Sequence, residues 1–595
     1  MPLIRTTTLL ALAVLAGCAS APPAELQTPQ NRWQVQFEFP VSHQQNVGDD
    51  LLIVGTERHL YGLEPQTGQT YWRLRNVNTN ARDIIDLPDK PYLLVSDAAG
   101  GAFDDAGTHM LAVNRTSGEI VWESEVLGGR VLQARVDHAR SRLYAVLVIG
   151  SHGDDRGLLH DLLPSKGIMS GFEAEPRMAA LDLETGEVLW RMPFGEAVRM
   201  RPSIRPGVGG AGAHGGLRPF DLGLYHPPML VEDLVCVSYA GLSCYHVDTG
   251  RPVWADRFET LDGDLGLSYP DPILRDARLL AGDTEQLYAF NPQNGEELWR
   301  SDDIGRVPEL LDDEVILYAQ VGGRYFDADD EQWVARGPFA VAAINRRNGN
   351  ILWKYRLRRS ISNLLIAGEF VYVADEEHLF ALDRLDGSLG LRELHQLKEP
   401  PTILALNEGG DLVLISTSEA AGYNRQTGRI RWYETHPAPR AGAWARFAAG
   451  LMNVTGGLLR LSSNLISHGR GLLPPVPNIQ TGGRRIMSGR GVLRDTTGYL
   501  GEFLLSQGSA INADHSYANL SGRTQYFVTR PQGHDVAALA AVNIETGQTH
   551  ALTVLPTIST ALVIDEINGQ AYQADGATLT AIPLGAVETP KVAAE

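Results

Sequence analysis

The chain has 595 residues, of which 71 are acidic and 51 are basic, so its formal net charge is −20. Apolar side chains make up 44% of the sequence, which is typical of a globular protein and excludes a disordered or fibrous one. The negative charge disfavours nucleic-acid binding, because a phosphate backbone would be repelled. Three cysteines are too few for a disulfide framework or a thiolate zinc site, so we expect an apolar core to supply the stability.

The N-terminus has the pattern of a short export signal. Arg5 supplies the positive charge, and the apolar run 9–15 is too short to span a bilayer. The run leads into Leu-Ala-Gly-Cys18, which resembles the lipobox of bacterial lipoproteins, in which the cysteine is acylated and becomes the new N-terminus. The resemblance implies a signal peptide over 1–17 and a lipid on Cys18. Two or three acyl chains hold a protein on a membrane without spanning it.

The residues after Cys18 predict the location of the mature protein. Ala19 is not the aspartate that resembles an inner-membrane retention signal, so we expect attachment to the outer membrane, facing the periplasm. Residues 18–30 contain the lipidated cysteine and an Ala/Pro-rich stretch that we interpret as a tether. No later apolar stretch has the length and low charge of a transmembrane helix.

An eleven-residue pattern recurs through the rest of the chain. It consists of a small residue, any residue, Asp or Asn, two variable residues, Thr/Ser/Asn, Gly, three variable residues and Trp. Four copies are full or nearly full, three are looser, and two that begin at Ala381 and Ala541 lack the tryptophan, which makes nine. The tryptophans of the pattern are Trp72, Trp122, Trp190, Trp254, Trp299, Trp353 and Trp432.

Each copy predicts a β-hairpin. Asp/Asn and Thr/Ser side chains bond to their own backbone in tight turns, and the following glycine supplies a positive φ. Two more short strands precede most copies, for example at 51–54 and 370–373, so a unit has four strands and about 40 residues. Such units are typical of the blades of a β-propeller. We expect each indole to dock where the next blade offers the small first residue of its pattern.

These motifs resemble the tryptophan-docking repeats of the pyrroloquinoline-quinone-like β-propeller superfamily. The resemblance implies an all-β fold, a single closed propeller over residues 31–585, followed by a tail over 586–595. Strands near 561–582 have no Gly-to-Trp strand after them, and the N-terminal segment 32–39 supplies one, so we expect a shared closing blade. This gives eight to ten blades, and the degenerate seventh and ninth units are the candidates for decorations outside the ring.

Three insertions exceed the repeat, at about 150–177, 205–226 and 436–520. Long loops in a compact fold tend to be functional or mobile. The last insertion contains apolar residues at helical spacing, which predicts an amphipathic helix. Its apolar face could pack on the propeller, bind a partner, or lie on a membrane surface. The residues of this face are Trp444, Phe447, Leu451, Val454, Leu458, Leu461 and Leu465.

Several other motifs carry weak signals. The glycines of 207–212 match a dinucleotide-binding spacing, but no βαβ unit surrounds them, so we interpret the segment as a loop. The acidic run 327–331 lacks the spacing of a calcium loop and predicts a solvated hairpin tip. We expect no metal site and no cofactor, although a polar cluster in the first insertion has metal-ligating residue types. That cluster consists of His152, Asp154, Asp155, His160 and Asp161.

Cys236 and Cys244 flank a turn near residue 240, which predicts that they lie opposite each other on adjacent strands. An oxidising periplasm permits a disulfide between them. A reduced thiol is the alternative, because Cys244 occupies the small position of its repeat. We expect no catalytic residue here, since no arrangement of nucleophile and base can be read from the sequence.

The lipobox, tether and docking repeats together resemble the propeller lipoproteins of the outer-membrane β-barrel assembly machinery. The resemblance implies a non-catalytic scaffold that is held on the membrane by a lipid anchor and binds envelope protein partners. We expect no nucleic-acid ligand. One alternative is a quinoprotein dehydrogenase that uses pyrroloquinoline quinone and calcium, although the adjacent cysteine pair common in those enzymes is absent. The other alternative is a propeller that binds envelope polysaccharide.

Overall fold

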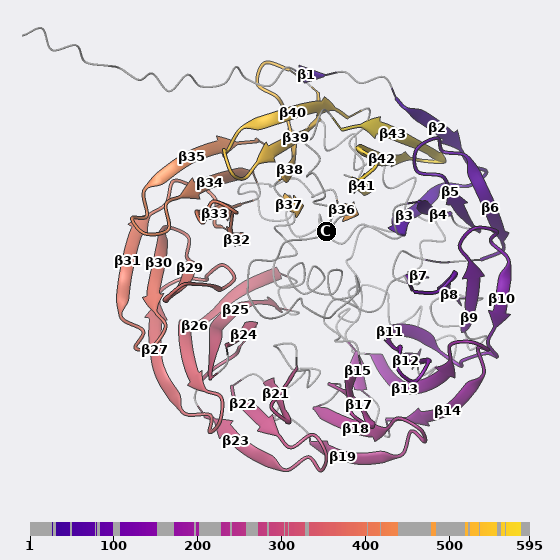
Figure 1. Cartoon of the computed structure of the whole chain (residues 1–595), viewed down its shortest axis with the longest axis horizontal. Coiled ribbons are helices and arrows are strands. Elements are labelled where there is room, and N and C mark those ends of the chain that lie inside the picture. The colour runs from indigo at the N-terminus through magenta and orange to yellow at the C-terminus, as the bar shows by residue number, and fades with distance from the viewer. Residues whose placement is uncertain are drawn as a thin grey trace, which may run out of the picture.

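The computed structural model is a closed ring of ten β-sheets around a central axis (Figure 1). It describes residues 26–27, 31–98, 108–150, 172–200, 228–256, 272–437, 478–482 and 518–584, with short gaps inside these ranges. The described part contains strands and turns and no helix. The prediction of an all-β propeller is therefore confirmed, with the blade count at the upper end of the expected range. The degenerate seventh and ninth units are full blades of the ring.

The first five blades are antiparallel meanders that run from the innermost to the outermost strand. Blade 1 contains β3 (Val41–Val47), β4 (Leu51–Thr56), β5 (His59–Leu63) and β6 (Thr70–Arg75). Blade 2 contains β7 (Ile84–Ile85), β8 (Tyr92–Ala98), β9 (Thr108–Asn114) and β10 (Ile120–Glu123). Blade 3 contains β11 (Arg130–Asp137), β12 (Arg142–Gly150), β13 (Phe172–Asp182) and β14 (Val188–Pro193), and β15 (Val198–Met200) pairs with β13. Blade 4 contains β16 (Met229–Val231), β17 (Leu234–Val237), β18 (Leu242–His246) and β19 (Pro252–Asp256). Blade 5 contains β20 (Ile273–Arg275), β21 (Arg278–Gly282), β22 (Leu287–Phe290) and β23 (Glu297–Ser301).

The next four blades repeat this order. Blade 6 contains β24 (Glu309–Asp313), β25 (Ile316–Asp327), β26 (Gln332–Asn345) and β27 (Ile351–Leu357). Blade 7 contains β28 (Leu365–Ala367), β29 (Phe370–Ala374), β30 (His378–Asp383) and β31 (Leu389–Leu394). Blade 8 contains β32 (Ile403–Leu406), β33 (Leu412–Ile415), β34 (Glu419–Tyr423) and β35 (Ile430–Thr435). Blade 9 contains β37 (Ala518–Ser521), β38 (Thr524–Thr529), β39 (Ala538–Asn543) and β40 (Thr549–Val554), with β1 (Leu26–Gln27) added outside β40.

Blade 10 joins the two ends of the chain. The C-terminal strands β41 (Ala561–Asp565), β42 (Gln570–Asp575) and β43 (Thr578–Pro583) form its inner part, and the N-terminal β2 (Trp33–Gln36) is the outer strand. Trp33 lies opposite Ala581 in this antiparallel pair. The prediction that the N-terminal segment closes the ring as part of a shared blade is therefore confirmed.

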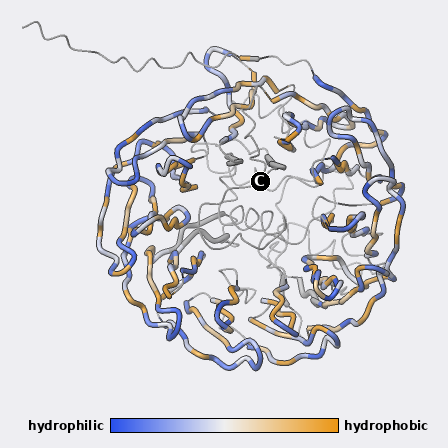
Figure 2. The backbone as a smooth tube through the Cα atoms, in the orientation of Figure 1, coloured by the Kyte–Doolittle hydropathy of each residue, from blue (hydrophilic) through white to orange (hydrophobic). Residues whose placement is uncertain are grey.

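The apolar core lies between neighbouring blades. One cluster joins Tyr144, Met178 and Trp190 of blade 3 to Val235 and Tyr245 of blade 4, all of them buried. Figure 2 shows hydrophobic residues recurring along the strands in every sector of the ring. Because both faces of an inner sheet are covered by neighbours, each blade needs apolar residues on both sides of its central strands.

The repeat tryptophans connect each blade to the next. The indole Nε1 of Trp122 donates to the Leu183 carbonyl of blade 3 at 2.9 Å. The same ring covers Gly186, whose φ is +73°, so that a Cβ at this glycine would collide with the indole. Glycine is thus required twice over, by the positive φ and by the close approach of the ring.

The small first residue of the pattern lies elsewhere than expected. Ala112 is directly opposite Trp122 in the hairpin of blade 2, and Ala180 is opposite Trp190 in that of blade 3. The small residue therefore makes room for the indole of its own hairpin. The next blade contributes the turn glycine and a carbonyl, so the expectation that it offers its small residue was wrong.

Trp33 is an eighth docking tryptophan. Its Nε1 donates to the Pro65 carbonyl of blade 1 at 2.8 Å, and its ring covers Gly68. The two halves of its repeat stand at opposite ends of the chain, which explains why the linear pattern does not reveal it. Ala581, the small residue opposite Trp33, was the available signal.

Substitution of Trp122 should separate the hydrogen bond to Leu183 from the packing of the indole on Gly186. Trp122→Ala leaves a cavity beside Gly186, and we expect a loss of about 3–5 kcal/mol in the free energy of unfolding. Trp122→Phe keeps most of the bulk and removes the indole donor, while the Tyr92 hydroxyl still donates to the Leu183 carbonyl, so the loss should be about 1 kcal/mol. Urea unfolding followed by circular dichroism measures both, and equal losses for the two variants would contradict the assignment.

Candidate functional site

The meander topology separates the connections of the ring onto two faces. Within a blade, the connections between the first and second strands and between the third and fourth strands lie on one face. We call it the turn face. The connections between the second and third strands, and those from one blade to the next, lie on the opposite face, which we call the insertion face.

All long connections lie on the insertion face. Turn-face connections are short, the longest being the six residues of 64–69, 86–91, 291–296 and 424–429. The insertion face has long connections at 99–107, 151–171, 201–228, 257–272 and 436–517. The three insertions predicted from the sequence are among them. A face with long connections on a rigid scaffold is a typical place for binding.

Two hairpins extend the blades on the insertion face. In blade 3 the pairing of β12 with β13 continues to Gly150 and Ala174, and β15 adds to the extended end of β13. In blade 6, β25 and β26 have 12 and 14 residues, and Figure 1 shows this hairpin running toward the centre of the ring. Its described end is the pair Asp327 and Gln332. The acidic run 327–331 therefore falls at the hairpin end, and of this run only Asp327 is among the described residues.

The longest insertion contributes a strand to the inner edge of another blade. It leaves blade 8 at β35 and returns at β37 of blade 9, yet β36 (Asn478–Gly482) pairs in parallel with β41 of blade 10. β36 also lies beside β3 of blade 1 and β37 of blade 9. The segment thus reaches past blade 9 to the inner edge of the closing blade. The predicted helix from Trp444 to Leu465 lies outside the described residues.

The turn face is held together by ion pairs. Arg346, in the turn of the repeat, accepts the indole N–H of Trp299 on its carbonyl at 3.0 Å. Its guanidinium contacts Asp312 at 2.8 Å and Asp276 of blade 5 at 2.6 Å. Arg115 pairs with Asp86 in the equivalent way. These arginines stabilise the docking contacts, which identifies the turn face as structural.

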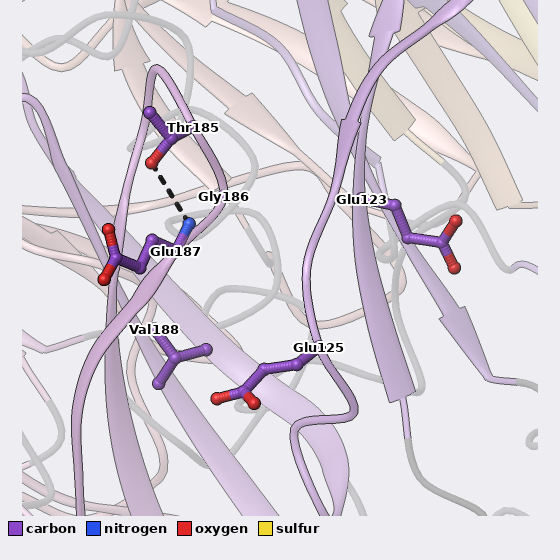
Figure 3. Close-up of a pocket in the computed structure, with 6 residues that line it drawn as sticks. All are labelled: Glu123, Glu125, Thr185, Gly186, Glu187 and Val188. Carbon is purple, nitrogen blue, oxygen red and sulfur yellow. Dashed lines mark hydrogen bonds between the residues drawn. The ribbon is translucent and has the colours of Figure 1, made fainter.

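A pocket of about 350 Å³ lies between blades 2 and 3 and is lined mainly by carboxylates and a turn (Figure 3). Glu125 pairs with Arg191 at 2.8 Å, and Glu123 lies 3.4 Å from Nδ1 of His109. The lining residues are Glu123, Glu125, Thr185, Gly186, Glu187 and Val188. Gly186 is the glycine under Trp122, so the pocket belongs to a docking seam. No cluster of three or more His, Cys, Asp or Glu with metal-binding geometry occurs among the described residues.

Two titratable groups lie between blades. The carboxylate of Glu309 accepts the Leu364 N–H at 2.8 Å, and burial raises the pKa of Glu309 to about 7. The ring of His436 stacks on Phe527 with centroids 4.8 Å apart, and burial lowers the pKa of His436 to about 4. Nε2 of His436 also lies 3.5 Å from the Thr549 hydroxyl of blade 9, so both groups are positioned as parts of the blade interfaces.

A family model described as outer membrane protein assembly factor BamB matches residues 25–167, 174–317 and 283–449. The chain belongs to the BamB family. A curated BamB from Burkholderia pseudomallei (strain K96243) is 24% identical over 344 residues, which covers 51% of this chain and 79% of that protein.

Solved structures with similarity to this chain include a BamB and a methanol dehydrogenase. BamB from Moraxella catarrhalis has 13% identity and a TM-score of 0.32, covering 68% of this chain and 100% of the other. A europium-containing methanol dehydrogenase has 12% identity and a TM-score of 0.33, covering 68% and 87%. The family match itself stops at residue 449, before most of the longest insertion.

The other predicted site residues fall into two groups. Cys18, the polar cluster of 152–161 and the glycines of 207–212 lie outside the described residues. Cys236 and Cys244 are directly opposite each other on β17 and β18, with Cα atoms 4.1 Å apart, and a disulfide joins them. Both are buried, and Cys244 lies opposite Trp254 of its own hairpin.

In this BamB-family ring, the docking contacts weaken around blades 7 to 9. Leu391 takes the place of tryptophan in blade 7 and lies over Gly428 together with Glu393. Trp432 of blade 8 covers Gly547, but its buried Nε1 has no hydrogen-bond acceptor among the described residues. In blade 9, Ala551 occupies the tryptophan position of the repeat, opposite Ala541. The longest insertion leaves the ring within this sector, between blades 8 and 9.

Restoring the missing tryptophan should strengthen the seam between blades 7 and 8. Gly428 keeps a φ of +65° and can receive an indole. We expect Leu391→Trp to raise the free energy of unfolding by about 1–2 kcal/mol through added apolar burial. The matched control Leu391→Trp with Gly428→Ala should lose this gain, because the Cβ blocks the ring. Unfolding in guanidinium chloride measures both variants, and an unchanged or lower stability of the single variant would refute the assignment.

Acidification should destabilise the ring through His436. Its folded pKa of about 4 lies below the ordinary value of about 6.5, so the unfolded chain binds the proton more tightly. This contribution to stability is complete above pH 6.5 and is lost as the pH falls toward 4. Between pH 7 and pH 5 it amounts to about 2 kcal/mol.

His436→Phe preserves the stacking on Phe527 and should remove this part of the pH dependence, measured as melting temperature against pH. His534→Gln changes an exposed histidine and serves as the control. A pH profile of His436→Phe that coincides with that of the unsubstituted protein would exclude His436 as the titrating group.

Proposed function

We propose that this protein is a lipid-anchored, non-catalytic scaffold of the bacterial envelope that binds protein partners during outer-membrane protein assembly. The observation that carries the proposal is the family match, which extends over residues 25–449 in three segments. The curated relative is named as an outer membrane protein assembly factor. The lipobox at Cys18 supports the anchor, and the outer membrane facing the periplasm is the proposed location.

The distribution of connections supports a binding role for the insertion face. Ion pairs and short turns occupy the opposite face, where they hold the docked indoles in place. These docking contacts lie on the turn face, away from the extended hairpins of blades 3 and 6. A partner that binds there leaves the contacts between blades intact, which a scaffold requires.

The disulfide of blade 4 supports an oxidising compartment. Such bonds persist in the periplasm and outside the cell, and are rare in the cytosol. It closes a loop of eight residues across one hairpin, so its contribution is local. In the part of the chain that is described, no helix has the length and apolar character to cross a membrane.

The proposal is tested by crosslinking in intact cells and purification of the tagged, full-length lipoprotein from detergent-solubilised envelopes, followed by mass spectrometry. We expect stoichiometric recovery of outer-membrane assembly proteins. Replacement of 438–517 by a short Gly/Ser linker should reduce this recovery at least about tenfold, a loss of roughly 1.4 kcal/mol in binding. Circular dichroism must show that the ring of this variant still unfolds cooperatively.

The matched control inserts the same linker into the turn-face connection at 522–523, where we expect recovery to stay unchanged. Undiminished recovery after replacement of 438–517 would show that this insertion does not bind the partner. If no partner is recovered and the purified chain instead binds pyrroloquinoline quinone with calcium, measured by absorbance titration, the scaffold is the wrong function and the dehydrogenase is favoured.

A further inference from the structure

The segment between the proposed lipid anchor and the ring is attached to the outer edge of blade 9. Leu26 and Gln27 form β1, which pairs in parallel with Leu552 and Thr553 of β40. Figure 1 shows β1 beside β40 at the outer margin of the ring. The tether expected over 18–30 is therefore bound to the rim before the chain enters β2.

This attachment limits how far the rim of blade 9 can be from an acylated Cys18. Eight Cα steps separate residue 18 from residue 26. A fully extended chain covers at most about 3.3–3.6 Å per residue, so the two Cα atoms are at most about 28 Å apart. A membrane that holds Cys18 thus lies near this rim, whereas the rim of blade 4 is on the opposite side of the ring (Figure 1).

The same sector of the rim differs in charge from the others. The outer edge of blade 9 is β40 (THALTV) with β1 (LQ) outside it, and the outer edge of blade 10 is β2 (WQVQ). None of these three strands contains Asp, Glu, Lys or Arg. The other eight outer strands each contain at least one such residue, as in β6 (TYWRLR) and β31 (LGLREL). An uncharged surface loses less solvation energy on approaching lipid headgroups than a charged one. These strands also bring no acidic side chain against an anionic bilayer, which would repel one, although the chain as a whole has a net charge of −20.

We infer that the outer rim of blades 9 and 10 is a membrane-facing surface whose partner is the lipid bilayer. The ring stands on this edge, with its axis parallel to the membrane, because β1 holds the tether there. Both the turn face and the insertion face then remain open to the periplasm. The inference rests on the proposed lipidation of Cys18 and adds to it the orientation of the anchored protein.

The test uses the full lipidated protein, reconstituted into vesicles of phosphatidylethanolamine and phosphatidylglycerol that carry a fluorescent acceptor lipid. A donor dye is placed on one introduced cysteine at a time, since Cys236 and Cys244 are joined and Cys18 is acylated. Gln548→Cys marks the exposed position directly before β40 in blade 9, and Ala255→Cys marks an exposed position of β19 in blade 4. We expect energy transfer from position 548 to exceed that from position 255 at least about twofold. The reason is that the tether limits the distance of position 548 from the membrane but not that of position 255.

A second variant tests whether β1 produces the orientation. Leu26→Pro with Gln27→Pro removes the backbone donors of β1, and because the strand is peripheral the melting temperature should stay the same. The difference in energy transfer between the two positions should then collapse. Ala24→Pro, which precedes β1 in the tether, is the matched control and should keep the difference.

Each outcome decides a separate point. Equal energy transfer from the two positions of the lipidated protein overturns the orientation and leaves the anchor intact. A difference that persists without β1 overturns the role of the tether, and would place another contact at the membrane. If mass spectrometry finds no acyl chain on Cys18, the anchor of the proposed function fails, and the orientation fails with it.

Discussion

The contact of an indole with a left-handed glycine is the constraint on which this ring depends. The tryptophan can cover Gly186 or its equivalents only because the glycine lacks a Cβ, and the turn can form only because that glycine accepts a positive φ. The carbonyl that receives the indole N–H lies in the same turn. One short sequence thus supplies the bend of a hairpin and the socket for its neighbour. This coupling explains why turn and tryptophan recur together in the sequence.

Because each contact joins only two successive blades, stability is distributed locally around the ring. A blade can lose its indole, as blade 7 does at Leu391, while its strands remain paired. Likewise, a long connection can be added on the insertion face without altering the turn-face contacts. The sector from blade 7 to blade 9 combines weakened contacts with the longest insertion, whereas every outer strand of blades 1 to 6 contains a docking tryptophan.

Repetition is what made the fold predictable from the sequence. Alternating strands, a turn and one tryptophan per unit define a blade, and the unpaired C-terminal strands pointed to closure by the segment around Trp33. The socket of the indole was assigned to the wrong residue, because spacing does not distinguish a cross-strand neighbour such as Ala112 from a residue of the next blade. β36 was not predicted either, since parallel pairing of Asn478 with Ala561 is a contact between distant segments that leaves no periodic signal.

Closure by β2 has a consequence for how the ring forms. The outer strand of blade 10 lies far ahead of its partner β43 in the chain. The pair Trp33 and Ala581 therefore cannot form until synthesis has passed β43, and joining segments so distant in sequence is entropically slow. A chain that stops before β43 remains an open arc with unpaired edges. Ring closure thus acts as a built-in checkpoint, because the closed shape depends on both of these distant strands.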